Sequence, residues 1–271
     1  MTAPQTADFE VTDSLVYHPE GRIHVRTWTP TVASGNGLAG NPIVMFHDSL
    51  GCVALWRDFP ALLCAATGRR VIAYDRLGFG QSDARSDRPG LDFIAEEATR
   101  YFGVLREQLG LGGFVLFGHS VGGGMAANCA AKFADDCEAL VTVAAQAFTE
   151  DRTVGGIEAA KAQFRDEQQL QRLTRYHGDK ARWVLEAWTE TWLHPGFASW
   201  SIADALPKVR CPVLAIHGTE DEYGSTRHPQ MIAELSAGPA RAEILADTGH
   251  VPHRERPKQV LELVSGFLAG R

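Results

Sequence analysis

Six short apolar runs, separated by longer segments with helical periodicity, constrain the fold of this chain more than any other feature. The runs occupy residues 43–47, 70–75, 114–119, 139–145, 212–218 and 242–248. Most of these runs have consecutive rather than alternating apolar residues, as is typical of strands that helices cover on both faces of a parallel sheet. Helical patterns at residues 54–66, 91–109 and 121–133 fall between the runs. The sequence therefore predicts successive strand–helix–strand units.

Two departures from this alternation complete the predicted architecture. Residues 14–28 contain two alternating segments around the turn sequence PEG, which predicts an antiparallel hairpin at a sheet edge. Residues 148–206 contain helical patterns and no strand-like run. We therefore predict an α/β fold with a doubly wound, mostly parallel, eight-stranded sheet. Residues 1–147 and 207–271 would form this core domain, with a helical cap inserted at residues 148–206.

Composition argues against several classes of protein. The chain has no run of about 18 apolar residues and no basic, apolar leader, so we expect no membrane span, no signal peptide and a cytoplasmic location. A net charge of −7 without a basic aromatic patch argues against nucleic-acid binding. The five cysteines form no C-x-x-C pair and the histidines show no zinc spacing. We therefore expect reduced thiols that serve packing, and neither a metal nor another cofactor.

The segment FVLFGHSVGGG, residues 114 to 124, joins a predicted strand to a predicted helix through a very short turn. Such a turn at the carboxyl edge of a parallel sheet lifts one side chain, here that of Ser120, clear of its neighbours. Glycines at 118, 122 and 123 would let strand and helix cross closely. The amino end of the helix would favour negative charge at the same place. This pattern predicts a nucleophilic serine.

A serine nucleophile needs a histidine base, and that histidine needs a carboxylate to orient it. Candidates lie in two loops that follow predicted strands. The segment HGTEDEYG offers Glu220, Asp221 and Glu222, and the segment DTGHVPHRERP offers His250 and His253. Both loops would lie at the sheet edge that carries the serine.

Several motifs together resemble the α/β-hydrolase superfamily, from about residue 15 to residue 269. They are FHDSLG at 46–51, YDRLGFGQSD at 74–83, GHSVGG at 118–123, and the HGTED and GHVPHRERP segments. The resemblance implies a triad of Ser120, Asp221 and His250, in the chain order expected for this fold. It also implies an oxyanion hole made by the backbone amides of Ser49 and Val121.

The oxyanion loop departs from the family pattern, because Asp48 stands where a glycine is usual. A carboxylate directed into the site would oppose the oxyanion that the loop stabilises. Since the other catalytic positions match the family, our hypothesis is that Asp48 faces away from the site and accepts hydrogen bonds from backbone amides as a brace.

Aromatic residues crowd the later part of the predicted cap, and there they would pack on the core domain and make the pocket mostly apolar. We expect His47, Asp48, His119 and Trp188 to contact the substrate. Basic residues of the cap alternate with acidic ones, which favours a solvated surface over a site for an acidic carrier protein. These basic residues are Arg165, Arg172, Arg175, Lys180 and Arg182.

The function expected from the resemblance is a serine hydrolase that cleaves a carboxylic ester of a small, largely apolar molecule through an acyl-enzyme on Ser120. One alternative is a carbon–carbon bond hydrolase of the same fold, although EDEYGS lacks the D-R-x-x-P pattern usual after the acid in those enzymes. The other alternative is a ligand receptor with this fold. The sequence does not fix the oligomeric state.

Overall fold

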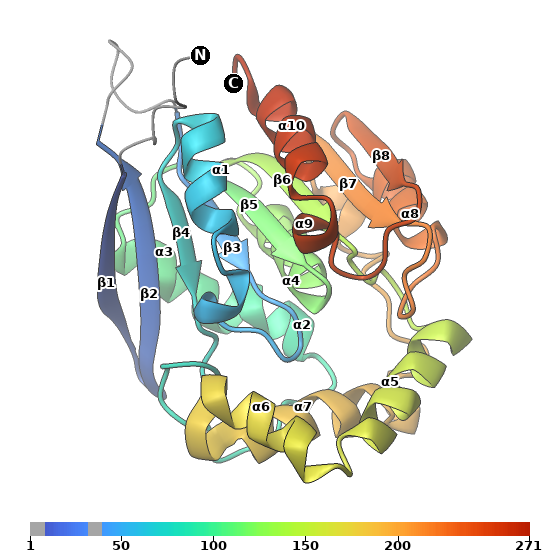
Figure 1. The fold of residues 1–271 in the computed structure, drawn as a ribbon. Helices are drawn as coiled ribbons and strands as arrows, with labels where there is room; N and C mark the ends of the chain where they lie inside the picture. Colours follow the sequence, from blue (N-terminus) through green and yellow to red (C-terminus); the bar gives the residue numbers. More distant parts are fainter. Residues whose placement is uncertain (1–8, 32–39) are drawn as a thin grey trace, which may run out of the picture.

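A computed structural model describes residues 9–31 and 40–271 and contains an eight-stranded sheet in the order β1-β2-β4-β3-β5-β6-β7-β8 (Figure 1). The strands are β1 Phe9–His18, β2 Gly21–Pro30, β3 Ile43–Phe46, β4 Val71–Tyr74, β5 Phe114–His119, β6 Cys137–Val143, β7 Val213–Gly218 and β8 Ala240–Leu245. The first two strands are antiparallel, and all others run parallel from β4 to β8. The predicted eight-stranded, mostly parallel sheet is confirmed.

Ten α-helices connect or flank these strands within the described residues. They are α1 Phe59–Thr67, α2 Phe93–Glu96, α3 Phe102–Gln108, α4 Val121–Lys132, α5 Asp151–Gln163, α6 Glu167–His177, α7 Ala181–Trp192, α8 Arg227–Leu235, α9 Pro252–Glu255 and α10 Pro257–Leu268. Short helical turns lie at Val53–Trp56, Glu97–Tyr101, Gly178–Lys180, Pro195–Phe197 and Leu206–Lys208. None of the described helices is long and apolar enough to cross a membrane.

The hairpin at the sheet edge forms where the turn residues predict it. Strand β1 ends at His18 and β2 begins at Gly21, and these two residues are paired partners. The two-residue loop leaves no room for a register shift, so the alternating segments pair along their whole length.

Both faces of the sheet are covered, which explains why the central strands are continuously apolar. Along β5, Phe114 and Leu116 belong to one hydrophobic cluster, whereas Val115 and Phe117 belong to another. Figure 1 shows α1 and α10 on the near face and α3 and α4 behind the sheet. A strand between two such layers must be apolar at every position.

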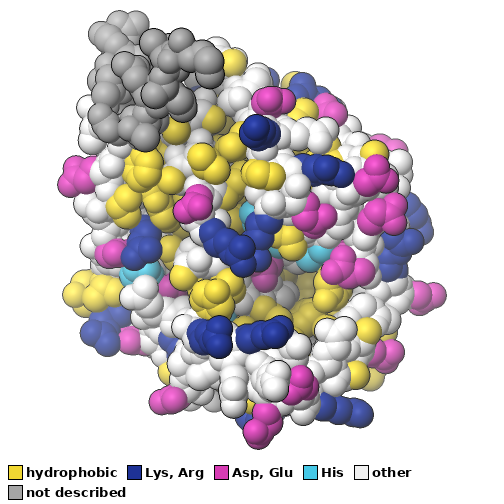
Figure 2. Space-filling view, in the orientation of Figure 1, with side chains coloured by type: hydrophobic (Ala, Val, Ile, Leu, Met, Phe, Trp, Pro, Cys, Tyr) yellow, Lys and Arg dark blue, Asp and Glu magenta, His cyan; other side chains and the backbone are white. Residues whose placement is uncertain are grey.

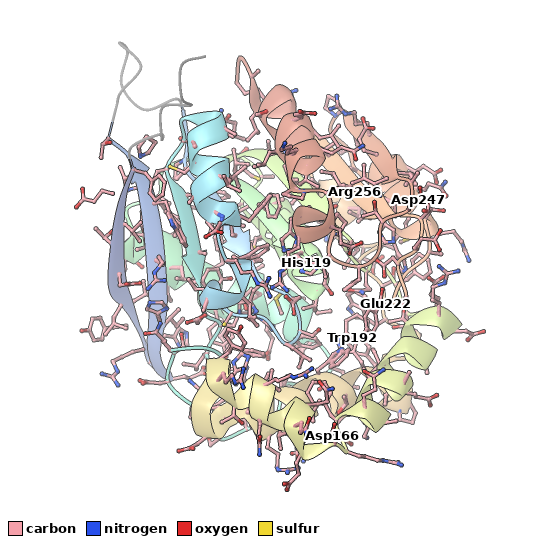
Figure 3. The ribbon with its side chains drawn as sticks, viewed as in Figure 1. His119, Asp166, Trp192, Glu222, Asp247 and Arg256 are labelled. Carbon is pink, nitrogen blue, oxygen red and sulfur yellow. The ribbon has the colours of Figure 1, made fainter. Side chains whose placement is uncertain are left out.

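Helices α5, α6 and α7 lie together beyond the carboxyl edge of the sheet (Figure 1). A backbone bridge pairs Phe148 with Ser201, so the two ends of this helical segment meet. Trp192 at the end of α7 is 3% exposed and lies on the side of the helices that faces the sheet edge (Figure 3). The division into a core domain and a cap stays a prediction, and this arrangement is the geometry that it requires.

Candidate active site

Ser120 occupies a strained backbone position between β5 and α4. Its φ of 56° and ψ of −127° lie where residues other than glycine are rare. A Cβ on Gly118 would lie 2.2 Å from the Gly122 carbonyl oxygen, and a Cβ on Gly122 would lie 2.2 Å from that of Phe46. Only glycine fits at these two positions, so the sharp turn predicted from the sequence is confirmed.

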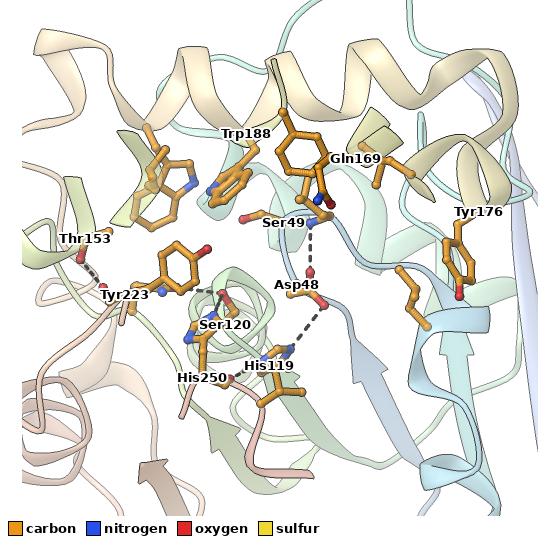
Figure 4. A pocket seen from close by; sticks show the side chains of 18 of the residues that line it. Asp48, Ser49, His119, Ser120, Thr153, Gln169, Tyr176, Trp188, Tyr223 and His250 are labelled. Carbon is orange, nitrogen blue, oxygen red and sulfur yellow. Dashed lines mark hydrogen bonds and ion pairs between the residues drawn. The ribbon is translucent and has the colours of Figure 1, made fainter. Parts of the chain in front are cut away.

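The predicted triad residues come together from three loops at the carboxyl edge of the sheet (Figure 4). His250 Nε2 lies 3.0 Å from Ser120 Oγ, and His250 Nδ1 lies 2.9 Å from both carboxylate oxygens of Asp221. Asp221 is 1% exposed, and one of its oxygens also accepts hydrogen bonds from the amides of Tyr223 and Gly224. This acid is therefore fixed in position, as an orienting carboxylate must be.

The electrostatics of the His250–Asp221 pair favour a charged carboxylate and a basic imidazole. Burial alone would raise the pKa of Asp221, but the hydrogen bond from His250 and its charge outweigh burial and lower that pKa. Burial alone would lower the pKa of His250, but the hydrogen bond to Asp221 raises it above its ordinary value of 6.5. The imidazole can therefore accept a proton more readily than a free histidine.

The two predicted oxyanion amides, those of Ser49 and Val121, have no hydrogen-bond acceptor among the described residues. Val121 is the first residue of α4, where amides have no partner within a helix. Ser49 lies in the loop after β3 and lines the same pocket as Ser120. Both amides are thus free to donate to a bound oxygen.

Asp48 braces the oxyanion loop, but it does not face away from the site. Its Oδ1 accepts a hydrogen bond of 3.0 Å from the Leu50 amide, as the brace hypothesis predicts. Its Oδ2, however, lies 3.4 Å from Nδ1 of His119, and the residue lines the pocket. Burial would raise the pKa of Asp48, but the contact with His119 outweighs burial and lowers that pKa.

A pocket of about 310 Å³ opens above Ser120 and His250, between the sheet edge and helices α5 to α7 (Figure 4). Asp48, His119 and Trp188 line it, as predicted for residues that contact the substrate. His47 does not line it. The His47 ring is 1% exposed, and its Nε2 accepts a hydrogen bond from the Arg76 amide. The prediction that His47 contacts the substrate is therefore wrong. The buried His47 ring instead supports the backbone of the loop after β3, where its Nδ1 lies 2.8 Å from the Asp48 carbonyl oxygen.

The alternative base His253 is also excluded by its position. Its side chain is 3% exposed and packs against the rings of Trp56 and Phe59, at centroid distances of 4.9 and 5.3 Å. Burial holds the pKa of His253 well below its ordinary value. Its ring serves packing in the core, and His250 alone of the two reaches the serine.

Sequence reasoning missed several residues that contact the triad, among them Gln146 and Tyr223. Gln146 Oε1 lies 3.2 Å from Ser120 Oγ and competes with His250 for the hydroxyl hydrogen. The Tyr223 ring stands edge-on to the His250 ring at 4.7 Å between centroids. Gln146 follows β6 by three residues, so its place after a parallel strand was a signal that could have indicated it. Tyr223 follows the predicted acid by two residues.

No group of three or more His, Cys, Asp or Glu side chains within residues 9–31 and 40–271 is arranged to hold a metal ion.

Comparison with known proteins identifies the family. The model of the alpha/beta hydrolase fold family matches residues 41–184, more than half of the chain. The 1-acylglycerol-3-phosphate O-acyltransferase of Homo sapiens is 37% identical over 113 residues, which are 40% of this chain and 31% of that protein. This chain thus spans only about a third of the length of that relative. The non-heme chloroperoxidase of Streptomyces lividans is 28% identical over 77% of this chain and 81% of its own.

A bifunctional esterase/perhydrolase of Acinetobacter calcoaceticus is 27% identical over 67% of this chain and 75% of its own. Among solved structures, a proline iminopeptidase of Mycobacterium smegmatis shares the fold with a TM-score of 0.71 and 22% identity, over 95% of this chain and 97% of its own. A 2-hydroxy-6-oxo-6-phenylhexa-2,4-dienoate hydrolase of Rhodococcus has a TM-score of 0.79 at 15% identity, over 96% of this chain and 99% of its own. The chain belongs to the α/β hydrolase fold family.

Proposed function

We propose that the protein is a serine hydrolase that cleaves carboxylic esters of small molecules through an acyl-enzyme on Ser120. The observation that carries this proposal is the continuous line from Ser120 Oγ to His250 to Asp221, at 3.0 and 2.9 Å, on the floor of a pocket. The name of the esterase/perhydrolase relative supports an ester substrate. Action in the cytoplasm, without a cofactor, is part of the same proposal.

The first half-reaction forms the acyl-enzyme. Ser120 Oγ attacks the ester carbonyl carbon while His250 Nε2 accepts the hydroxyl proton. The carbonyl oxygen becomes an oxyanion and accepts hydrogen bonds from the amides of Ser49 and Val121. The bond from the carbonyl carbon to the alcohol oxygen then breaks, and His250 returns its proton to the departing alcohol.

The second half-reaction releases the acid. Water takes the place of the alcohol, His250 accepts a proton from it, and the resulting nucleophile attacks the acyl carbon. The bond between the carbonyl carbon and Ser120 Oγ breaks, and His250 returns the proton to the serine. The charge of Asp221 stabilises the imidazolium that exists in each half-reaction.

Helices α5 to α7 would act as the cap of this site. They contribute Ile157, Leu173, Trp188 and Trp192 to the pocket, so an ester in the site is largely surrounded by apolar side chains. Exclusion of water by such a cover strengthens the hydrogen bonds to the oxyanion.

The test is the release of p-nitrophenol from acetate through decanoate esters by the wild type and by Ser120→Ala. We expect the substitution to reduce kcat about a thousandfold or more. Ser265→Ala is the matched control, because Ser265 lies on α10 and does not line the pocket. A mass increase by one acyl group on the wild type after a short pulse, absent from Ser120→Ala, would identify the intermediate. Turnover that survives in Ser120→Ala would overturn the proposal.

A further inference from the structure

The pocket has two chemically different ends, with Ser120 between them. At one end lie Thr153 and Tyr223, and at the other lies Tyr176 (Figure 4). The hydroxyl of Thr153 is already engaged, because it donates to the Tyr223 carbonyl oxygen at 2.7 Å. The first end is therefore mainly apolar and aromatic, because Ile157, one turn from Thr153 on α5, also belongs to the lining.

The end at Tyr176 carries two guanidinium groups. Arg172 precedes Tyr176 by about one turn on α6, so both side chains project from one face of that helix. Arg254, on the short helix α9, donates a hydrogen bond to the Leu55 carbonyl oxygen, and its guanidinium lies near enough to Tyr176 for that residue to influence its pKa. All four of these residues line the pocket. Figure 2 shows Lys and Arg side chains on both sides of the hollow in this face of the molecule.

Neither of these arginines has an acidic partner in the described part of the chain. No Asp or Glu oxygen there lies within 4.0 Å of the guanidinium of Arg172 or of Arg254. Arg88, by contrast, is paired with Glu186 at 3.0 Å. Burial lowers the pKa of the Arg254 guanidinium, but arginine remains charged at any working pH. Arg172 is exposed, as expected for a solvated cap surface, and it also belongs to the lining of the pocket.

Asp48, the single acidic residue in the pocket lining, is not paired with Arg172 or Arg254. Asp48 is held by the Leu50 amide and faces His119. The lining thus holds two guanidinium groups and one carboxylate, while the carboxylate of Asp221 lies outside the lining and contacts His250. A negatively charged group of a bound molecule would find donors at these two guanidinium groups.

We infer that the substrate carries a carboxylate at the end remote from its scissile ester, and that Arg172 and Arg254 bind this carboxylate. The inference rests on the proposed function, which it extends from esters in general to half-esters of dicarboxylic acids and similar molecules. Guanidinium groups suit a carboxylate because their parallel N–H donors match its two oxygens. The apolar end would receive the uncharged part of the substrate.

Two esters with the same acyl chain distinguish the effect of a terminal charge from the effect of chain length. The first is mono-p-nitrophenyl adipate, and the second is its methyl ester, which keeps the chain and removes the charge. We expect the wild type to have a kcat/KM at least tenfold higher for the charged ester, and this preference to fall as salt is added. Arg172→Gln and Arg254→Gln should each lose most of the preference, mainly through a higher KM for the charged ester.

Arg175→Gln is the matched control. Arg175 is exposed on the same helix but does not line the pocket, so its substitution should leave the preference unchanged. If the wild type hydrolyses both esters equally, or if the double variant of Arg172 and Arg254 keeps the preference, the inference is wrong while the proposed esterase stands.

A binding measurement keeps the inference testable without turnover. Calorimetric titration of adipate into Ser120→Ala should give a saturable binding signal. This signal should be lost when Arg172→Gln and Arg254→Gln are combined with Ser120→Ala. If adipate binds in this manner but no ester is cleaved, the anion site stands and the proposed reaction fails. If adipate does not bind, the carboxylate site is refuted whatever the activity on neutral esters. Circular dichroism of each variant establishes that it is folded.

Discussion

Asp48 Oδ2 lies 3.4 Å from Nδ1 of His119, and the opposite nitrogen of the same ring, Nε2, lies 2.8 Å from the carbonyl oxygen of His250. A carbonyl only accepts, so Nε2 carries a proton, and the contact with the carboxylate is attractive only when Nδ1 carries one too. At 3.4 Å the two atoms are in contact, but no well-aligned hydrogen bond joins them. The chain Asp48–His119–His250 thus links the loop after β3 to the loop that holds the proposed base.

Removal of the Asp48 carboxylate should therefore reduce activity. We expect Asp48→Gly to lower kcat on p-nitrophenyl butyrate about tenfold, because both the oxyanion loop and His250 lose a support and small displacements in a site are costly. Asp48→Asn keeps the acceptor for the Leu50 amide and should lose less. In a double-mutant cycle, adding His119→Gln to Asp48→Gly should cost little more than either change alone. A tenfold rise in turnover for Asp48→Gly would show that the carboxylate opposes the oxyanion instead.

The pH dependence of kcat/KM should report the raised pKa of His250. Only the neutral imidazole accepts the serine proton, so activity falls as pH drops through that pKa. Because Asp221 raises this pKa, the acidic limb should lie above pH 6.5. Asp221→Asn should move the limb to lower pH and reduce kcat by about 10⁴. Glu220→Gln, at an exposed position in the same loop, should change neither the acidic limb nor kcat. An unshifted limb in Asp221→Asn would contradict the role of Asp221 as the partner of His250.

Gly80 and Gly110 provide a matched pair for stability, since both have positive φ, at 48° and 62°. A Cβ on Gly80 would lie 2.2 to 2.4 Å from the Asp75 carboxylate atoms, whereas a Cβ on Gly110 would have nothing within 4 Å. Asp75 cannot move easily, because its carboxylate accepts from the Val53 and Gln81 amides. We expect Gly80→Ala to lower the free energy of unfolding by about 3 kcal/mol and Gly110→Ala by about 1 kcal/mol.

Chemical denaturation midpoints measure this difference. Equal losses for the two variants would show that the Asp75 carboxylate yields to the added methyl group.

The cysteines should be unreactive in the folded protein. All five are buried, and burial raises the pKa of the Cys52 thiol to about 12 and that of Cys64 to about 11. A thiol reagent such as Ellman's should therefore react with none of them over minutes in the native protein and with all five in guanidinium. The sulfurs of Cys137 and Cys211 lie only 3.6 Å apart. A count of three in guanidinium would reveal an oxidised pair, and rapid native reaction would contradict the burial.

The mostly parallel sheet and the serine turn were predictable because each depends on nearby residues. A continuously apolar run needs cover on both faces wherever it lies, and the Gly118 and Gly122 positions are restricted by a turn of a few residues. Local chemistry was sufficient for these features. The choice of Asp221 and His250 among the candidate acids and histidines rested on the resemblance to the α/β-hydrolase superfamily.

What only the tertiary structure decided are contacts between segments far apart in the chain. His47 and His253 look like site residues by sequence, yet packing places both rings in the interior. Arg172 and Arg254 come from α6 and α9, and nothing near either one indicates that they face the same pocket. Which charged side chains line a pocket depends on how distant segments pack together. The spacing of residues along the sequence does not reveal this.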